Sequence, residues 1–130
     1  MLREVEKTRQ IPDEPLRRWF AGRECDILVW MTGEGMLWGF EFRYPRAGAV
    51  EADALLRWDC EGSVVHHLID FGSGAGNGFK VTPLYGPEVP CDLDRVLGVY
   101  ESELDAGADA VLMDIAAILR ETKRRGMVFE

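Results

Sequence analysis

A chain of 130 residues has the usual size of one domain and is long enough to bury a substantial core. Hydrophobic residues make up 47% and charged residues 29%, which excludes the composition of a disordered chain. The net charge is −8, and eight acids stand against one base between residues 88 and 114. This charge disfavours nucleic-acid binding, because contacts to phosphates require lysine and arginine.

The sequence contains no apolar run near the ~20 residues that cross a bilayer, and residues 1–10 are too charged for a secretory signal. Cys25, Cys60 and Cys91 are odd in number, widely spaced and without a CxxC pair. They therefore indicate reduced thiols rather than a disulfide framework or a zinc site. We expect a cytoplasmic protein of one domain, residues 1–130, that binds no membrane, cofactor or metal.

Residues 1–10 are predicted to form a loosely ordered leader. Residues 13–21 follow as a short helix, with Asp13 as its N-cap, Pro15 in its first turn and Gly22 as its end. Leu16, Trp19 and Phe20 have the spacing of one helical face.

An antiparallel sheet is predicted over residues 25–84. Residues 25–32 are apolar on both faces, and the GEG at residues 33–35 is typical of a hairpin loop. Residues 36–44 alternate clearly, with one side formed by Met36, Trp38, Phe40, Phe42 and Tyr44. Further strands are expected at 51–59, 63–71 and, at an edge, 80–85. The short connections predict a meander of four to five strands.

Residues 72–79 contain four glycines and predict a mobile loop, which lacks the spacing of either common phosphate-binding motif. Two amphipathic helices are then expected over residues 92–124, with Asp92 as the first cap and Gly107 between them. Strands followed by helices predict an α+β fold, with both C-terminal helices packed on one face of the sheet.

Several short patterns are shared with known sequences, in the order RRWF (17–20), DxxVW (26–30), GF (39–40), Trp58, HHxxD (66–70) and KxTPL (80–84). With them, residues 11–125 resemble a group of small bacterial proteins that have no assigned function. The resemblance implies no activity, cofactor or catalytic residue.

The strand at 63–71 carries the polar residues most suggestive of a site. A histidine beside a carboxylate is able to exchange protons or bind metal, and His66 and His67 precede Asp70. Consecutive strand residues point to opposite faces, however, and His66 lies ~13 Å along the strand from Asp70. We therefore favour a structural interpretation, with one histidine hydrogen-bonded under the helices and the other exposed.

Tryptophans provide a second set of candidates. Trp30 and Trp38 are expected in the core, whereas Trp19 and Trp58 end their elements and are placed to line a pocket. Arg43, Arg57 and His67 are the polar residues expected near such a pocket. The candidate ligand site therefore comprises Trp19, Arg43, Trp58, His66, His67 and Asp70.

The acidic helices provide a third candidate, a surface for a basic protein partner, with Asp94, Glu101, Glu103 and Asp105 as contact residues. Such acids also serve as an ordinary solvated helix face. Since no catalytic motif is present, the sequence favours a non-enzymatic interaction domain that presents either the acidic helices or the exposed sheet face. The alternative is a small-molecule or hydrolytic site near Trp58. A homodimer is compatible with the interaction domain and with this alternative.

Overall fold

The computed structural model describes residues 2–6, 8–23, 25–45, 53–70, 84–88 and 91–126. It confirms the α+β class and the antiparallel sheet. The strands are β1 (Arg3–Glu4), β2 (Leu16–Ala21), β3 (Asp26–Met31), β4 (Leu37–Pro45), β5 (Asp53–Asp59), β6 (Val64–Asp70) and β7 (Leu84–Glu88). The helices are α1 (Leu93–Ser102) and α2 (Ala110–Arg125).

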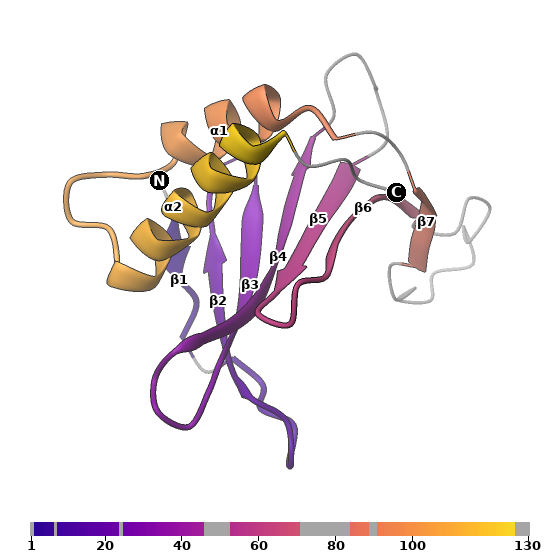
Figure 1. Cartoon of the computed structure of the whole chain (residues 1–130). Helices are drawn as coiled ribbons and strands as arrows, with labels where there is room; N and C mark the ends of the chain where they lie inside the picture. The colour runs from indigo at the N-terminus through magenta and orange to yellow at the C-terminus, as the bar shows by residue number, and fades with distance from the viewer. Residues whose placement is uncertain are drawn as a thin grey trace.

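The sheet has seven strands in the order β1-β2-β3-β4-β5-β6-β7, each antiparallel to its neighbour (Figure 1). This is the predicted meander, because every connection joins neighbouring strands. The predicted number of four to five strands was too low. The two additional strands, β1 and β2, come from the segments that were predicted as a leader and a helix.

The predicted helix at 13–21 is wrong, because all six residues of β2 pair with β3, from Leu16 opposite Met31 to Ala21 opposite Asp26. Asp13 has a φ of 67° and therefore lacks the extended backbone of an N-cap. The side chain of Gln10 instead exchanges two hydrogen bonds of 2.8 Å with the backbone of Arg17. The spacing of Trp19 and Phe20 fits a helix or a strand, and strand pairing decides between them.

The prediction of a loosely ordered leader at residues 1–10 is also wrong in part, because this segment contains β1, which pairs with β2. Arg18 secures this edge: its guanidinium binds Glu4 at 2.8 Å and Asp109 at 2.6 Å. Asp109 also caps α2 by accepting a hydrogen bond from the backbone N–H of Val111. One arginine thus connects β1, β2 and the start of α2.

Strand β4 follows the predicted alternation over most of its length, with Phe40, Phe42 and Tyr44 buried. A bulge shifts the register between β3 and β4, because Trp30 pairs with Gly39 but Met31 pairs with Leu37. Trp38 is the extra residue at this bulge and is half-buried. Met36, predicted to share the buried side, lies before the strand and is exposed.

Both predicted C-terminal helices are present and lie on the same side of the sheet (Figure 1). Asp92 caps α1, as predicted, by accepting hydrogen bonds from two backbone N–H groups. The core joins the sheet to the apolar faces of both helices; for example, the rings of Tyr100 and Phe42 are perpendicular, with 5.4 Å between their centroids. Neither described helix is long and apolar enough to cross a bilayer.

The glycine-rich loop predicted at 72–79, the loop after Pro45 and residues 80–83 of the last predicted strand lie outside the described residues.

Candidate functional site: the open face of the sheet

The sheet has two unlike faces. The covered face packs against α1 and α2 and is formed by Phe20 of β2, Ile27, Val29 and Met31 of β3, Phe40 and Phe42 of β4, Ala54 and Leu56 of β5, and His66 of β6. We call the opposite surface the open face, because neither helix in the described part of the chain lies on it (Figure 1). It is formed by Arg17, Trp19, Ala21, Asp26, Leu28, Trp30, Gly39, Glu41, Arg43, Asp53, Leu55, Arg57 and His67.

Trp30 is the aromatic residue at one end of the open face. The guanidinium carbons of Arg17 and Arg57 each lie 5.9 Å from its ring centroid, at a distance typical of cation–π contacts. Gly39 of β4 lies opposite Trp30, so no side chain stands beside the tryptophan on that strand. A Cβ at Gly39 would lie 2.9 Å from the carbonyl oxygen of Trp58, so the strands β4 and β5 approach too closely here for any other residue.

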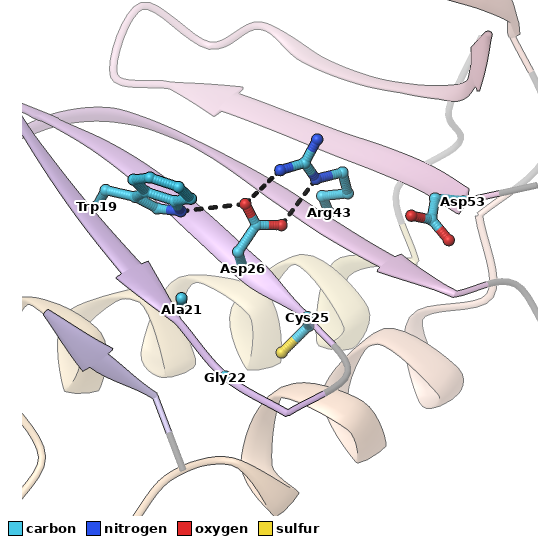
Figure 2. A pocket seen from close by; sticks show the side chains of 7 residues that line it. All are labelled: Trp19, Ala21, Gly22, Cys25, Asp26, Arg43 and Asp53. Atoms are coloured by element: carbon cyan, nitrogen blue, oxygen red, sulfur yellow. Dashed lines mark hydrogen bonds and ion pairs between the residues drawn. The ribbon is translucent and has the colours of Figure 1, made fainter. Parts of the chain in front are cut away.

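Trp19, Asp26 and Arg43 form a hydrogen-bonded row at the other end of the open face (Figure 2). The indole Nε1 of Trp19 donates to Asp26 Oδ2 at 3.1 Å, and Arg43 donates from Nε to Oδ1 at 2.7 Å and from Nη2 to Oδ2 at 2.5 Å. These bonds raise the pKa of the Arg43 guanidinium, against the opposing effect of desolvation. The row is therefore a fixed, charge-paired arrangement rather than a set of independent surface side chains.

A hollow of about 260 Å³ adjoins this row, lined by Trp19, Ala21, Gly22, Cys25, Asp26, Arg43 and Asp53 (Figure 2). Two of the six predicted ligand-site residues, Trp19 and Arg43, thus line one hollow. The tryptophan reaches it from a strand and not from the end of a helix.

The other predicted site residues divide between the two faces. Trp58 belongs to the covered face, where its ring stacks on Phe40 at 5.6 Å between centroids. His66 is also on the covered face, 1% exposed, with its Nε2 2.7 Å from the hydroxyl of Tyr44. The predicted structural role of one histidine under the helices agrees with this position.

His67 points to the open face, in the cross-strand row of Arg43 and Leu55, and is half-buried rather than fully exposed. Asp70 ends β6, where its backbone pairs with Leu84 of β7. The sheet therefore lies between Trp58 and His66 on one side and His67 on the other, and these residues do not form one site. The described part of the chain contains no group of three or more metal-ligating side chains.

The predicted acidic surface is largely engaged in contacts within the domain. Asp94 forms an ion pair with Lys123, and Glu101 pairs with Arg120 at 2.8 Å, so bases of α2 offset acids of α1. Glu103 is 7% exposed and accepts a hydrogen bond from the backbone N–H of Arg23 at 3.1 Å. Asp105, in the connection between the helices, is exposed.

The positions of Trp30, Arg17 and Asp26 on the open face were not predicted from the sequence. Trp30 was expected in the core because residues 25–32 are apolar on both sides. The overlooked signal was the charged Asp26 in this run, because a strand puts Asp26, Leu28 and Trp30 on one side and Ile27 and Val29 on the other.

The comparisons with known proteins add no relative to this picture. No protein-family model matches the chain, and no match was found among curated proteins or among solved structures. The resemblance noted in the sequence stays a prediction, and the geometry of the open face provides the basis for proposing a function.

Proposed function

We propose that this protein is a non-enzymatic interaction domain that binds a protein partner through the open face of its sheet. The observation that carries the proposal is the make-up of that face, on which Trp19, Leu28 and Trp30 lie among Arg17, Arg43 and Arg57. Tryptophan and arginine are the residues most enriched at the energetic centres of protein interfaces. Their pre-formed contacts lower the entropy lost on binding.

The charge distribution favours the open face over the acidic helices as the binding surface. Ion pairs from α2 already engage Asp94 and Glu101, and Glu103 is buried. A partner at the helices would have to compete with these internal contacts. The net charge of −8 still favours a basic partner, because long-range attraction does not require direct contact with every acid.

The geometry gives less support to a hydrolytic site near Trp58. His66 has a cysteine on the same side of the sheet, Cys91, whose side chain interacts with Tyr44. Burial, with a smaller effect of Asp92, raises the pKa of the Cys91 thiol to about 12. A catalytic cysteine requires a lowered pKa, so this arrangement opposes the formation of a thiolate nucleophile.

We further propose that the domain acts in the cytoplasm, which agrees with the reduced thiols that the cysteine spacing predicts. Neither nucleic acid nor membrane is proposed as a partner, since the arginines of the open face are matched by acids of the same face, such as Asp26 for Arg43 and Glu41 for Arg57.

Site-specific photocrosslinking in living cells tests the proposed surface. A photoreactive amino acid is placed at Arg57 on the open face or, as the matched control, at Met113 on the exposed side of α2. We expect position 57 to give a discrete adduct with another protein, and Trp30→Ala to reduce its yield. Higher salt during crosslinking in lysate should also reduce the yield if the partner is basic.

Other outcomes contradict the proposal. An adduct from position 113 but not from position 57 assigns binding to the helices. Adducts only between two copies of the chain indicate a homodimer instead of a separate partner. The absence of adducts at both positions refutes the surface altogether.

A further inference from the structure

The hollow beside Trp19 has an uncharged end and a charged end. The uncharged end is lined from β2 and the residue after it, by Trp19, Ala21 and Gly22 (Figure 2). Asp53 lines the charged end from β5. The pair of Asp26 and Arg43 stands between the two ends, on the strands β3 and β4 that separate β2 from β5. A single side chain of a ligand therefore contacts one end of the hollow and not the other.

The charges of the lining are already compensated within the domain. Asp26 accepts hydrogen bonds from Trp19 Nε1 at 3.1 Å and from Arg43 Nε at 2.7 Å. The pKa of the Arg43 guanidinium is raised mainly by its hydrogen bonds to Asp26, and further by the charge of Asp53. A charged side chain of a partner would lose hydration here, while both acids of the described lining already interact with Arg43. The hollow therefore disfavours a charged occupant.

The uncharged end has a fixed floor and an apolar wall. A Cβ at Gly22 would lie 2.5 Å from Glu103 Oε2 and 3.1 Å from a methyl carbon of Leu2, so the backbone packs directly on the residues beneath it. Ala21 adds only a methyl group to this floor. The wall is the indole of Trp19, which is 38% exposed and is held in place by the bond from its Nε1. An ordered apolar surface thus remains partly in water.

The apolar surface continues from the hollow along the open face. Leu28 lies opposite Trp19, two residues before Trp30 on β3, and is half-buried. The uncharged end of the hollow therefore belongs to the surface that carries the proposed function. The whole hollow has a volume of about 260 Å³, below the ~300–1,000 Å³ of pockets that enclose drug-sized ligands or cofactors. One side chain of a partner fits this size better than a complete small molecule.

We propose that the uncharged end of the hollow receives one large apolar side chain of the protein partner, packed on the indole of Trp19 beside Ala21. Burial of the exposed indole drives this contact, because the hydrophobic effect grows with the apolar area removed from water. Tryptophans beside well-packed, desolvated pockets are typical energetic centres of protein interfaces. This inference rests on the proposed function, since it names the kind of residue with which the partner binds the open face.

Nuclear magnetic resonance of the full chain tests the site with N-acetyl-leucine amide as the probe. The indole N–H signal of Trp19 is assigned with the Trp19→Phe variant and followed during titration. We expect a saturable shift with a millimolar dissociation constant, and nuclear Overhauser contacts from the methyl groups of the probe to Trp19 and Ala21. N-acetyl-asparagine amide has a polar side chain of similar shape and should give neither signal.

Ala21→Leu fills the hollow with a side chain of the protein itself and should weaken binding of the leucine probe roughly tenfold. Ala21→Val adds less volume, suits a strand and should weaken binding about threefold, so the test does not depend on the larger variant. Ala117→Leu is the matched control, because it makes the same change at an exposed position of α2. The indole signals of the other tryptophans verify that the variants remain folded.

An equal shift with the asparagine analogue, an unchanged affinity in folded Ala21→Leu and Ala21→Val, or no saturable shift refutes the apolar site. Tighter binding of N-acetyl-arginine amide than of the leucine probe would also overturn it, in favour of a cation site. If crosslinking from position 57 persists when the hollow fails these tests, the proposed function stands and only this contact is lost. If the hollow binds the leucine probe but position 57 gives no adduct, the apolar site stands and the proposed function fails.

Discussion

The covered and open faces are built from the same strands, yet their aromatic side chains differ in burial and in the residues that they contact. On the covered face, Phe42 lies between Tyr44 and Tyr100 and is fully excluded from solvent. On the open face, Trp30 has two arginines against its ring and stays half-buried. The first arrangement stabilises the fold through burial. The second leaves an aromatic ring partly exposed to solvent, while contacts with two arginines hold it in place.

The largest effect that distinguishes the faces is expected from truncating one aromatic residue on each. Phe42→Ala should lower the free energy of unfolding by about 3–5 kcal/mol, because it leaves a cavity in a packed core. Trp30→Ala should cost only about 1–2 kcal/mol, because its ring is still partly in water. Urea denaturation of both variants measures the difference. Equal losses would show that both faces are packed alike.

Gly39→Ala tests the close approach of strands on the open face. The new methyl group would meet the Trp58 carbonyl oxygen, which belongs to a paired strand and does not move easily, so we expect a loss of about 1–3 kcal/mol. Gly98→Ala is the control, because Gly98 is exposed in α1 and a Cβ there meets nothing within 4 Å. It should raise stability by roughly 0.5–1 kcal/mol in the same thermal or urea assay.

Arg18 provides a pH-dependent test of the link between sheet and helices. Hydrogen bonds from Arg18 lower the pKa of Glu4 and of Asp109 from their ordinary values of 4.5 and 3.8. A lowered pKa gives stability that is present above the ordinary value and is lost as the pH falls through the folded value. Arg18→Gln should therefore cost roughly 1–2 kcal/mol at pH 7 and progressively less below pH ~4.

Unfolding curves between pH 7 and pH 2 measure how the stability difference between Arg18→Gln and the parent protein decreases. Arg124→Gln is the control, because it removes an exposed ion pair within α2 and should have a smaller effect at neutral pH. A gap between Arg18→Gln and the parent protein that stays constant down to pH 2 would contradict the assigned ion pairs.

The predictable part of the fold was the part in which one periodicity dominates. Residues 37–45 alternate and the residues of α1 and α2 recur at helical spacing, so their types followed from the sequence. Residues 16–21 satisfy both periods, and their strand form depends on pairing with β3, a non-local contact that no local pattern contains. The bulge at Trp38 has the same origin.

The candidate site was less predictable because it requires knowledge of register. Trp19 and Arg43 were identified as pocket residues, but Asp26 was missed although it joins them, since it lies 17 residues from Arg43 along the chain. The separation of His66 from His67 followed from strand geometry alone. Which of these residues faces the helices depended on the packing of α1 and α2, which the sequence of β6 does not encode.

The smallest stability effect is expected at the acidic helices, and it is informative because it changes charge without changing packing. Arg120→Ala removes the exposed base that pairs with Glu101 and should alter the free energy of unfolding by less than about 0.5 kcal/mol. Binding through the open face should be unaffected, because Arg120 lies on a helix across the sheet from Trp30. If a basic partner instead binds the helices, Arg120→Ala leaves the Glu101 carboxylate without this base and should increase the crosslinking yield from position 113. A single variant thus separates the two surfaces by the direction of its effect on binding, with stability nearly constant.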